Sequence, residues 1–149
     1  MEEKEYKATY HKIASVRCIF EKALTNNHAR CSCARHFWLA DREGYACNSG
    51  DASEKCRELL SILREKSRFV LKIQQAGGLL PHNMELRVQA GGLQGLRSHF
   101  EAGSTGQIVD VHALVRRAEE KFSGFGRLPF DEIVQSVARF RGRKRKIRD

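Results

Sequence analysis

The chain has 149 residues, of which 41% are hydrophobic and 30% charged, and its net charge is +9. This size and composition are typical of a single globular domain. No apolar run approaches the roughly 18 residues that a membrane helix needs, and the charged start MEEKEYKATY lacks the apolar stretch of a secretory signal. We therefore expect a cytoplasmic protein that has no membrane partner.

The expected fold is mainly α: a single small helical domain over residues 1–138, followed by a basic arm over residues 139–149. Apolar residues at helical spacing predict one helix over residues 3–26 and another over residues 52–75. Asp51 would cap the second helix, with Glu54 completing a capping box, and Gly77-Gly78 would end it. Residues 28–50 between them lack periodicity, and they predict an irregular loop with a short extended piece at residues 37–39.

The second half of the chain predicts several shorter elements. Residues 84–89 fit either a strand or a short helix, a helix is expected over residues 93–100, and residues 103–106 form a loop. Asp110 would cap a helix over residues 111–122. The last helix would follow Pro129 and run from Phe130 to about Arg141.

Two pairs of these helices invite comparison with a helix-turn-helix. One pair, residues 86–90 and 93–100, would turn at Gly91-Gly92, and the other, residues 111–122 and 130–141, has a connection longer than the usual three to four residues. Ordinary helix packing is the favoured interpretation of both pairs. If the second pair did bind DNA, its arginines would make the contacts: Arg116, Arg117, Arg139 and Arg141.

All five cysteines fall between residues 18 and 56, with the spacing C-x12-C-x-C-x13-C-x8-C. An odd number of clustered cysteines, in a chain expected to be cytoplasmic, favours metal or redox chemistry over disulfides. One centre could hold the long loop in place, because metal-binding energy becomes folding energy. The predicted ligands are Cys31, Cys33, Cys47 and Cys56, with Cys18 as the spare and substitute, and with His28 and His36 as replacement ligands.

The spacing bears on the kind of metal. Structural zinc sites are usually built from C-x2–4-C pairs, which this chain lacks. One residue between Cys31 and Cys33 is also tight for two thiolates on one ion. An iron–sulfur cluster places its ligands on different irons, so the sequence favours a [4Fe–4S] cluster. Zinc is the alternative, and buried or free thiols without a metal are the third interpretation.

The C-terminal sequence RFRGRKRKIRD carries seven basic residues and one acidic residue, which supplies +6 of the net charge of +9. Such a block is typical of a contact with nucleic acid, and DNA is favoured over RNA. An anionic membrane is disfavoured, because Phe140 and Ile147 alone would be a weak anchor. The predicted contacts are Arg139, Arg141, Arg143, Lys144, Arg145, Lys146 and Arg148.

The sequence offers little sign of catalysis. The stretch AGGLQG lacks the lysine of a phosphate-binding loop, and no HExxH motif occurs. We therefore expect a DNA-binding protein with an iron–sulfur cluster rather than an enzyme. It would act in transcription regulation or as a subunit of a nucleoprotein complex, with a protein partner or a second copy as further partners. The alternatives are a zinc-stabilised structural subunit of a nucleoprotein assembly and an iron–sulfur electron-transfer protein.

Overall fold

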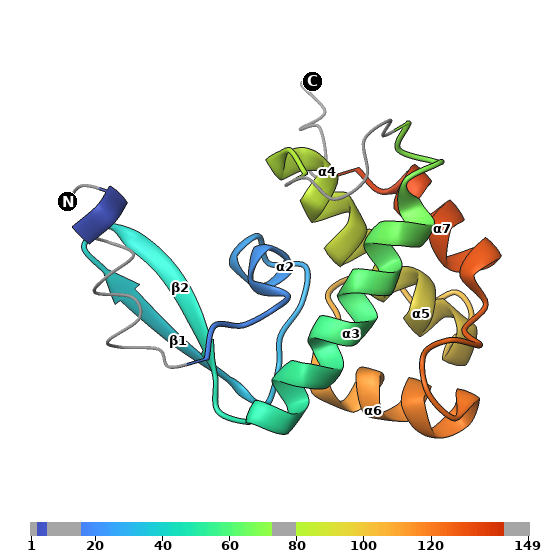
Figure 1. The fold of residues 1–149 in the computed structure, drawn as a ribbon, viewed down its shortest axis with the longest axis horizontal. Helices are drawn as coiled ribbons and strands as arrows, with labels where there is room; N and C mark the ends of the chain where they lie inside the picture. Colours follow the sequence, from blue (N-terminus) through green and yellow to red (C-terminus); the bar gives the residue numbers. More distant parts are fainter. Residues whose placement is uncertain (1–2, 6–15, 73–79, 142–149) are drawn as a thin grey trace.

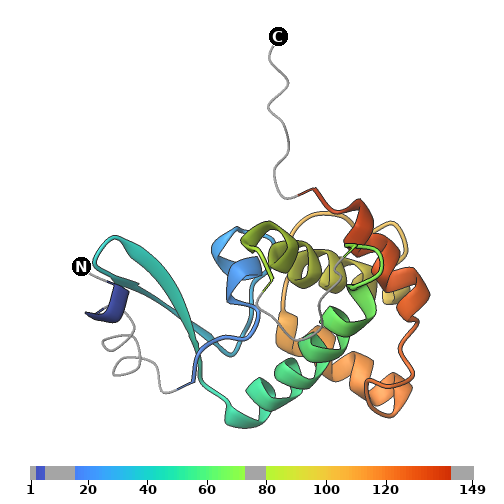
Figure 2. The same ribbon diagram turned by 45° about the horizontal axis from the view of Figure 1, so that its top comes forward.

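The structure is a computed structural model that describes residues 3–5, 16–72 and 80–141 (Figure 1). Within these ranges a group of packed helices carries one two-stranded hairpin, which confirms the mainly α prediction. In both views the hairpin projects from one side of the helical body (Figure 2). Two predicted features lie outside the described residues: the Gly77-Gly78 helix stop, and the arm residues Arg143, Lys144, Arg145, Lys146 and Arg148.

The hairpin occupies most of the segment expected to be an irregular loop. Strands β1 (Ala34–Leu39) and β2 (Arg42–Cys47) pair antiparallel, with Ala34 opposite Cys47 and Leu39 opposite Arg42. The turn between the strands uses Ala40 at φ 54°, which is left-handed backbone that alanine adopts rarely. The predicted extended piece at residues 37–39 lies within β1, but the rest of the loop prediction was wrong. The turn lacks the Asn-Gly or Asp-Gly signal by which such hairpins are found.

The first predicted helix is not continuous. Residues 3–5 are helical, but residues 16–18 run beside β2: the Cys47 N–H donates to the Val16 carbonyl at 2.8 Å, and the Cys18 N–H donates to the Tyr45 carbonyl at 3.1 Å. Helix α2 (Glu21–Thr25) follows as little more than one turn. The apolar periodicity was misleading here because pairing with the hairpin satisfies the same backbone groups that a helix would use.

Helix α3 (Gly50–Ser67) is the longest helix among the described residues. Its cap is Ser49 rather than Asp51, since the Ser49 hydroxyl accepts a hydrogen bond from the Ala52 N–H at 3.2 Å. The helix ends at Ser67, earlier than predicted, and residues 68–72 form turns. Its buried side chains enter the core together with others from α2, α5, α6 and α7, among them Phe20, Leu59, Leu63, Leu93, Leu96, Val115, Ile133 and Val137.

Residues 82–100 form one helical run, composed of α4 (His82–Leu86), the π-helical turn η1 (Arg87–Gly91) and α5 (Gly92–Phe100). Gly91 and Gly92 have right-handed helical backbone angles, so the proposed turn between two recognition helices does not exist there. The glycines instead allow close packing: a Cβ on Gly91 would lie 2.8 Å from the Val137 Cα, and a Cβ on Gly95 would lie 2.8 Å from the Ser136 Cβ.

Helices α6 (Val111–Phe122) and α7 (Phe130–Arg139) match their predicted positions closely. Helix α7 packs against α5, η1 and α3, whereas α6 packs against α3 and α5. The two helices are therefore held mainly by other elements, which fits ordinary helix packing. Because α7 reaches Arg139, the first residue of the predicted arm belongs to a helix. The division into a domain and an arm stays a prediction.

Candidate functional site

The base of the hairpin meets the start of α3 (Figure 1). The five cysteines lie in the segments that meet there. Cys18 lies in the segment beside β2, Cys31 and Cys33 in the turn before β1, Cys47 at the end of β2, and Cys56 on α3. Cys31, Cys33 and Cys47 lie near enough to Cys56 to raise the pKa of its thiol. Cys31, Cys47 and Cys56 likewise lie near enough to Cys18 to raise the pKa of its thiol. All four predicted ligands and the predicted spare are thus neighbours, and each is partly buried.

Backbone hydrogen bonds fix the turn that carries Cys31 and Cys33. The Ala34 N–H donates to the Cys31 carbonyl at 3.1 Å, which closes the turn. The Asn48 N–H donates to the Cys33 carbonyl at 2.8 Å and joins the turn to the end of β2. On that side the Cys47 thiol donates to the Ser49 carbonyl at 3.2 Å, next to the cap of α3.

The first turn of α6 also contacts this cysteine turn. The Asp110 carboxylate accepts hydrogen bonds from the Ser32 N–H at 2.9 Å and from the His112 N–H at 3.1 Å. The Cys31 sulfur accepts from the N–H groups of Cys33 and His112. The positive end of the helix dipole therefore faces Cys31. The sequence identified Asp110 as a helix cap but gave no sign of its long-range contact with Ser32.

Burial dominates the ionisation of these thiols. It raises the pKa of Cys18 and of Cys56 to about 12, and the neighbouring thiols add to the increase. Burial also raises the pKa of Cys31, although the N–H groups of Cys33 and His112 oppose it. Cys18 and Cys56 are therefore protonated at neutral pH and are poor nucleophiles. A metal that binds them must displace their protons, whereas a thiol enzyme would need a lower pKa.

The spread of the thiols limits what they could hold. In the described ranges, no three histidine, cysteine, aspartate or glutamate side chains lie close enough together to hold one metal ion. Tetrahedral zinc needs every sulfur at about 2.3 Å from a single point. The two candidate replacement histidines have other neighbours, since the His36 ring stacks on Tyr45 at 4.7 Å and the His28 ring meets Phe140 at 4.9 Å.

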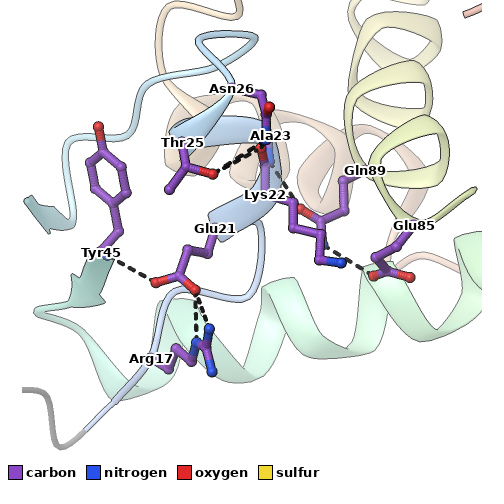
Figure 3. A network of polar contacts seen from close by, with 9 residues as sticks. All are labelled: Arg17, Glu21, Lys22, Ala23, Thr25, Asn26, Tyr45, Glu85 and Gln89. Atoms are coloured by element: carbon purple, nitrogen blue, oxygen red, sulfur yellow. Dashed lines mark hydrogen bonds and ion pairs between the residues drawn. The ribbon is translucent and has the colours of Figure 1, made fainter. Parts of the chain in front are cut away.

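A polar network that the sequence did not predict joins the hairpin to α2 (Figure 3). The Glu21 carboxylate accepts a hydrogen bond from the Tyr45 N–H at 2.9 Å and pairs with Arg17 at 2.6 Å. These residues lie beside Cys18, whose own N–H donates to Tyr45. The network therefore holds the segment that carries Cys18 against β2.

The same network continues into the helical body. The buried Gln89 side chain accepts from the Ala23 N–H at 3.1 Å and donates to the Glu85 carboxylate, also at 3.1 Å (Figure 3). The Arg64 Nε in turn donates to both carboxylate oxygens of Glu85, at 3.0 and 3.1 Å. The sign available in the sequence was a glutamate and a glutamine four residues apart, which places Glu85 and Gln89 on one face of a helix.

The structure describes two of the seven predicted nucleic-acid contacts. Arg139, at the end of α7, is exposed and donates to the Gln135 side chain at 2.8 Å, and Arg141 is exposed just after it. On α6, Arg116 and Arg117 are exposed as well. The Arg117 guanidinium lies over the Phe100 ring at 4.4 Å, a cation–π contact.

Arg139 and Arg141 border an open groove of about 960 Å³. One wall comes from α5, another from α7, and a third from the residues that follow α2. Residues that follow α5 also line the groove. Its lining residues are Asn27, His28, Gln94, Gly95, Ser98, Thr105, Gly106, Gln107, Glu132, Gln135, Ser136, Arg139, Phe140 and Arg141.

No known protein family, curated protein or solved structure matches this chain. Its function therefore has to be inferred from its own residues. None of the helices in residues 3–5, 16–72 and 80–141 combines the length and the apolar character needed to cross a bilayer. The cysteine group and the groove bordered by Arg139 and Arg141 are therefore the two candidate functional sites.

Proposed function

We propose that the chain is a nucleic-acid-binding protein whose hairpin and helices are tied together by a cysteine-ligated metal centre. The observation that supports this most strongly is the meeting of five cysteines from separate segments at the base of the hairpin. Protein interiors rarely gather thiols in such numbers without a metal or a disulfide. The protein would act as a regulator, or as a subunit of a nucleoprotein complex, and not as an enzyme.

The proposed group is a [4Fe–4S] cluster on Cys31, Cys33, Cys47 and Cys56, with Cys18 as the substitute ligand. The cysteine spacing supports a cluster over zinc, because the chain has no C-x2–4-C pair and the ligands of a cluster bind different irons. When bound, a cluster would supply a link between hairpin and helices that responds to redox state. Zinc stays the alternative group, and would make the chain a structural subunit.

The nucleic-acid part of the proposal rests on charge. Seven basic residues lie in the last eleven, and the two that the structure describes are exposed at the mouth of a groove. Each side chain that neutralises a phosphate releases counterions, so the logarithm of the affinity falls by about 0.9 per contact for each unit of log salt. An electron-transfer protein would not need such an arm.

The test compares the full chain with a variant in which Arg143, Lys144, Arg145, Lys146 and Arg148 are replaced by glutamine. This variant keeps the length of the arm and removes five charges. Binding of a fluorescent oligonucleotide is followed by anisotropy between about 50 and 200 mM salt. We expect the variant to bind weakly and its salt slope to be smaller by about 4. Equal affinities and equal slopes, or no binding by the full chain at low salt, would contradict the proposal.

A further inference from the structure

We infer that the groove between α5 and α7 binds the unpaired bases of a single-stranded nucleic acid. This inference rests on the proposed function and deepens it. In Figure 2 helices α5 and α7 lie side by side, and the groove of about 960 Å³ opens along them. Seven of its fourteen lining residues carry a side-chain amide or hydroxyl: Asn27, Gln94, Ser98, Thr105, Gln107, Gln135 and Ser136.

Several of these polar groups are available to a ligand. In the part of the chain that the structure describes, no hydrogen-bond partner meets the Gln94 amide or the Ser136 hydroxyl. The two groups come from the two helices that form the long walls. A side-chain amide offers a donor and an acceptor on one plane, which matches the edge of a nucleic-acid base. Bases that are already unpaired present those edges without any cost of opening a duplex.

An aromatic pair is among the lining residues of the groove. The rings of His28 and Phe140 meet edge to face with their centres 4.9 Å apart, and both residues line the groove. Aromatic rings are the usual platforms on which proteins stack splayed bases, whatever their sequence. The groove therefore combines the two kinds of contact, stacking and edge recognition, that single strands require.

The charge of the groove near Phe140 fits a polyanion. Arg139 and Arg141 line it beside Phe140, and Glu132 is the one carboxylate among its lining residues. In sequence, the remaining five basic residues follow Arg141 within seven positions. A strand whose bases enter the groove would thus place its phosphates next to arginines. A duplex is a poorer match, because proteins read it with an element that projects into the major groove, and this site is concave.

The test separates base contacts from phosphate contacts. The full chain is titrated with a fluorescent single strand, with the matching duplex, and with an abasic strand of equal length that keeps every phosphate. The groove variant carries Gln94→Ala and Ser136→Ala, which remove the two unpaired groups without changing the charge. The control variant is Asn83→Ala, an exposed amide outside the groove. Thermal unfolding of each variant verifies that the fold is kept.

We expect the full chain to prefer the single strand to the abasic strand, and the groove variant to lose about tenfold of its affinity for the single strand alone. Titrations with an RNA and a DNA strand of the same sequence identify the preferred sugar. Either preference supports the inference if the groove variant binds the preferred strand more weakly. Unchanged single-strand binding by the groove variant, tighter binding of the duplex, or equal competition by polyglutamate would overturn base recognition. In those cases salt-dependent binding would still support the proposed function, whereas no binding of any strand would overturn both.

Discussion

Cys56 is the residue on which the cysteine group depends most. It lies on α3, near enough to three other cysteines for them to raise the pKa of its thiol, and links the hairpin to the longest helix described. We expect Cys56→Ser to lower the amount of the proposed metal bound per chain, because one of its four predicted ligands is removed. Cys18→Ser should keep it, since Cys18 is the predicted spare. The measurement is the ratio of metal to protein after anaerobic purification, and the opposite pattern would exchange the two roles.

Asp110 serves two segments at once, as the cap of α6 and as the acceptor for the Ser32 N–H. Asp110→Ala removes both contacts and should lower the free energy of unfolding by about 1–3 kcal/mol. Asp110→Asn retains an acceptor at the same place and should cost less. Urea unfolding of both variants checks this prediction, which fails if the alanine variant is as stable as the wild type.

The ionisation of Asp110 gives this contact a pH dependence. Burial raises its pKa, but hydrogen bonds from Ser32, His112 and Ala113 outweigh burial, so the pKa lies below its usual value of 3.8. A lowered pKa in the folded state means that the charged carboxylate stabilises the fold above pH 3.8 and that this contribution disappears as the pH falls through the lower value. The stability difference between wild type and Asp110→Asn should therefore shrink on acidification below pH 4.

Gln89 provides a third test at this scale. Its buried side chain is the acceptor for the Ala23 N–H, so Gln89→Leu would leave that group buried without a partner. We expect a loss of about 1–3 kcal/mol in the free energy of unfolding. Gln94→Leu, which lies on the same helical run and breaks no hydrogen bond in the described structure, should change stability by less than about 0.5 kcal/mol. Similar losses for the two variants would argue against the network.

Among the elements, the packing of α5 on α7 depends on glycine. A Cβ on Gly95 would lie 2.8 Å from the Ser136 Cβ and 3.0 Å from the Ile133 Cα, so the two helices would have to move apart. Gly95→Ala should therefore destabilise the protein by about 1–3 kcal/mol. Gly50→Ala is the matched control, because nothing lies within 4 Å of its added Cβ. A stability for Gly95→Ala equal to that of the control would contradict this packing.

The elements also show what the sequence could reveal. Helix α6 was predictable because its apolar spacing and its Asp110 cap agree, and the start of α7 because Pro129 marks it. The prediction of a turn at Gly91-Gly92 was wrong, because the sequence does not distinguish a glycine that permits close helix packing from one that permits a turn. The hairpin was missed because its turn uses Ala40 in a left-handed conformation, which no local pattern indicates.

The candidate sites likewise contain some features that the sequence could predict and others that it could not. Clustering in the sequence identified the cysteines as a group, since segments within 40 residues of one another need only a hairpin to bring them together. The contact of Asp110 with Ser32 and the groove walls from Asn27 and Gln94 join residues more than 60 positions apart. Such contacts depend on the packed helices, so no spacing rule could predict them.

At the scale of the whole molecule, one short segment connects the cysteine group to the groove. The His28 carbonyl accepts from the Ile108 N–H at 2.9 Å, and the Arg30 carbonyl accepts from the Val111 N–H at 2.8 Å. His28 lines the groove, and Cys31 follows three residues later. Loosening the cysteine turn would therefore loosen one wall of the groove.

This connection predicts that nucleic-acid binding depends on the metal. Removing the proposed metal with a chelator should weaken single-strand binding severalfold, because the groove wall that contains His28 would loosen. Anaerobic reconstitution of the centre should restore the binding. The arm should be unaffected, so the salt slope should change little. Anisotropy titrations before removal, after removal and after reconstitution measure this. Identical affinities in all three states would show that the centre and the groove are independent.

The most direct test of the central claim is a visible absorption spectrum with metal analysis on protein purified without oxygen. A variant with all four predicted ligands changed to serine is the control. We predict a brown protein with about four irons per chain, and a colourless control. About one zinc per chain would retain the centre and replace the cluster by a structural ion. A colourless protein with neither metal, in which all five thiols are free, would contradict the account.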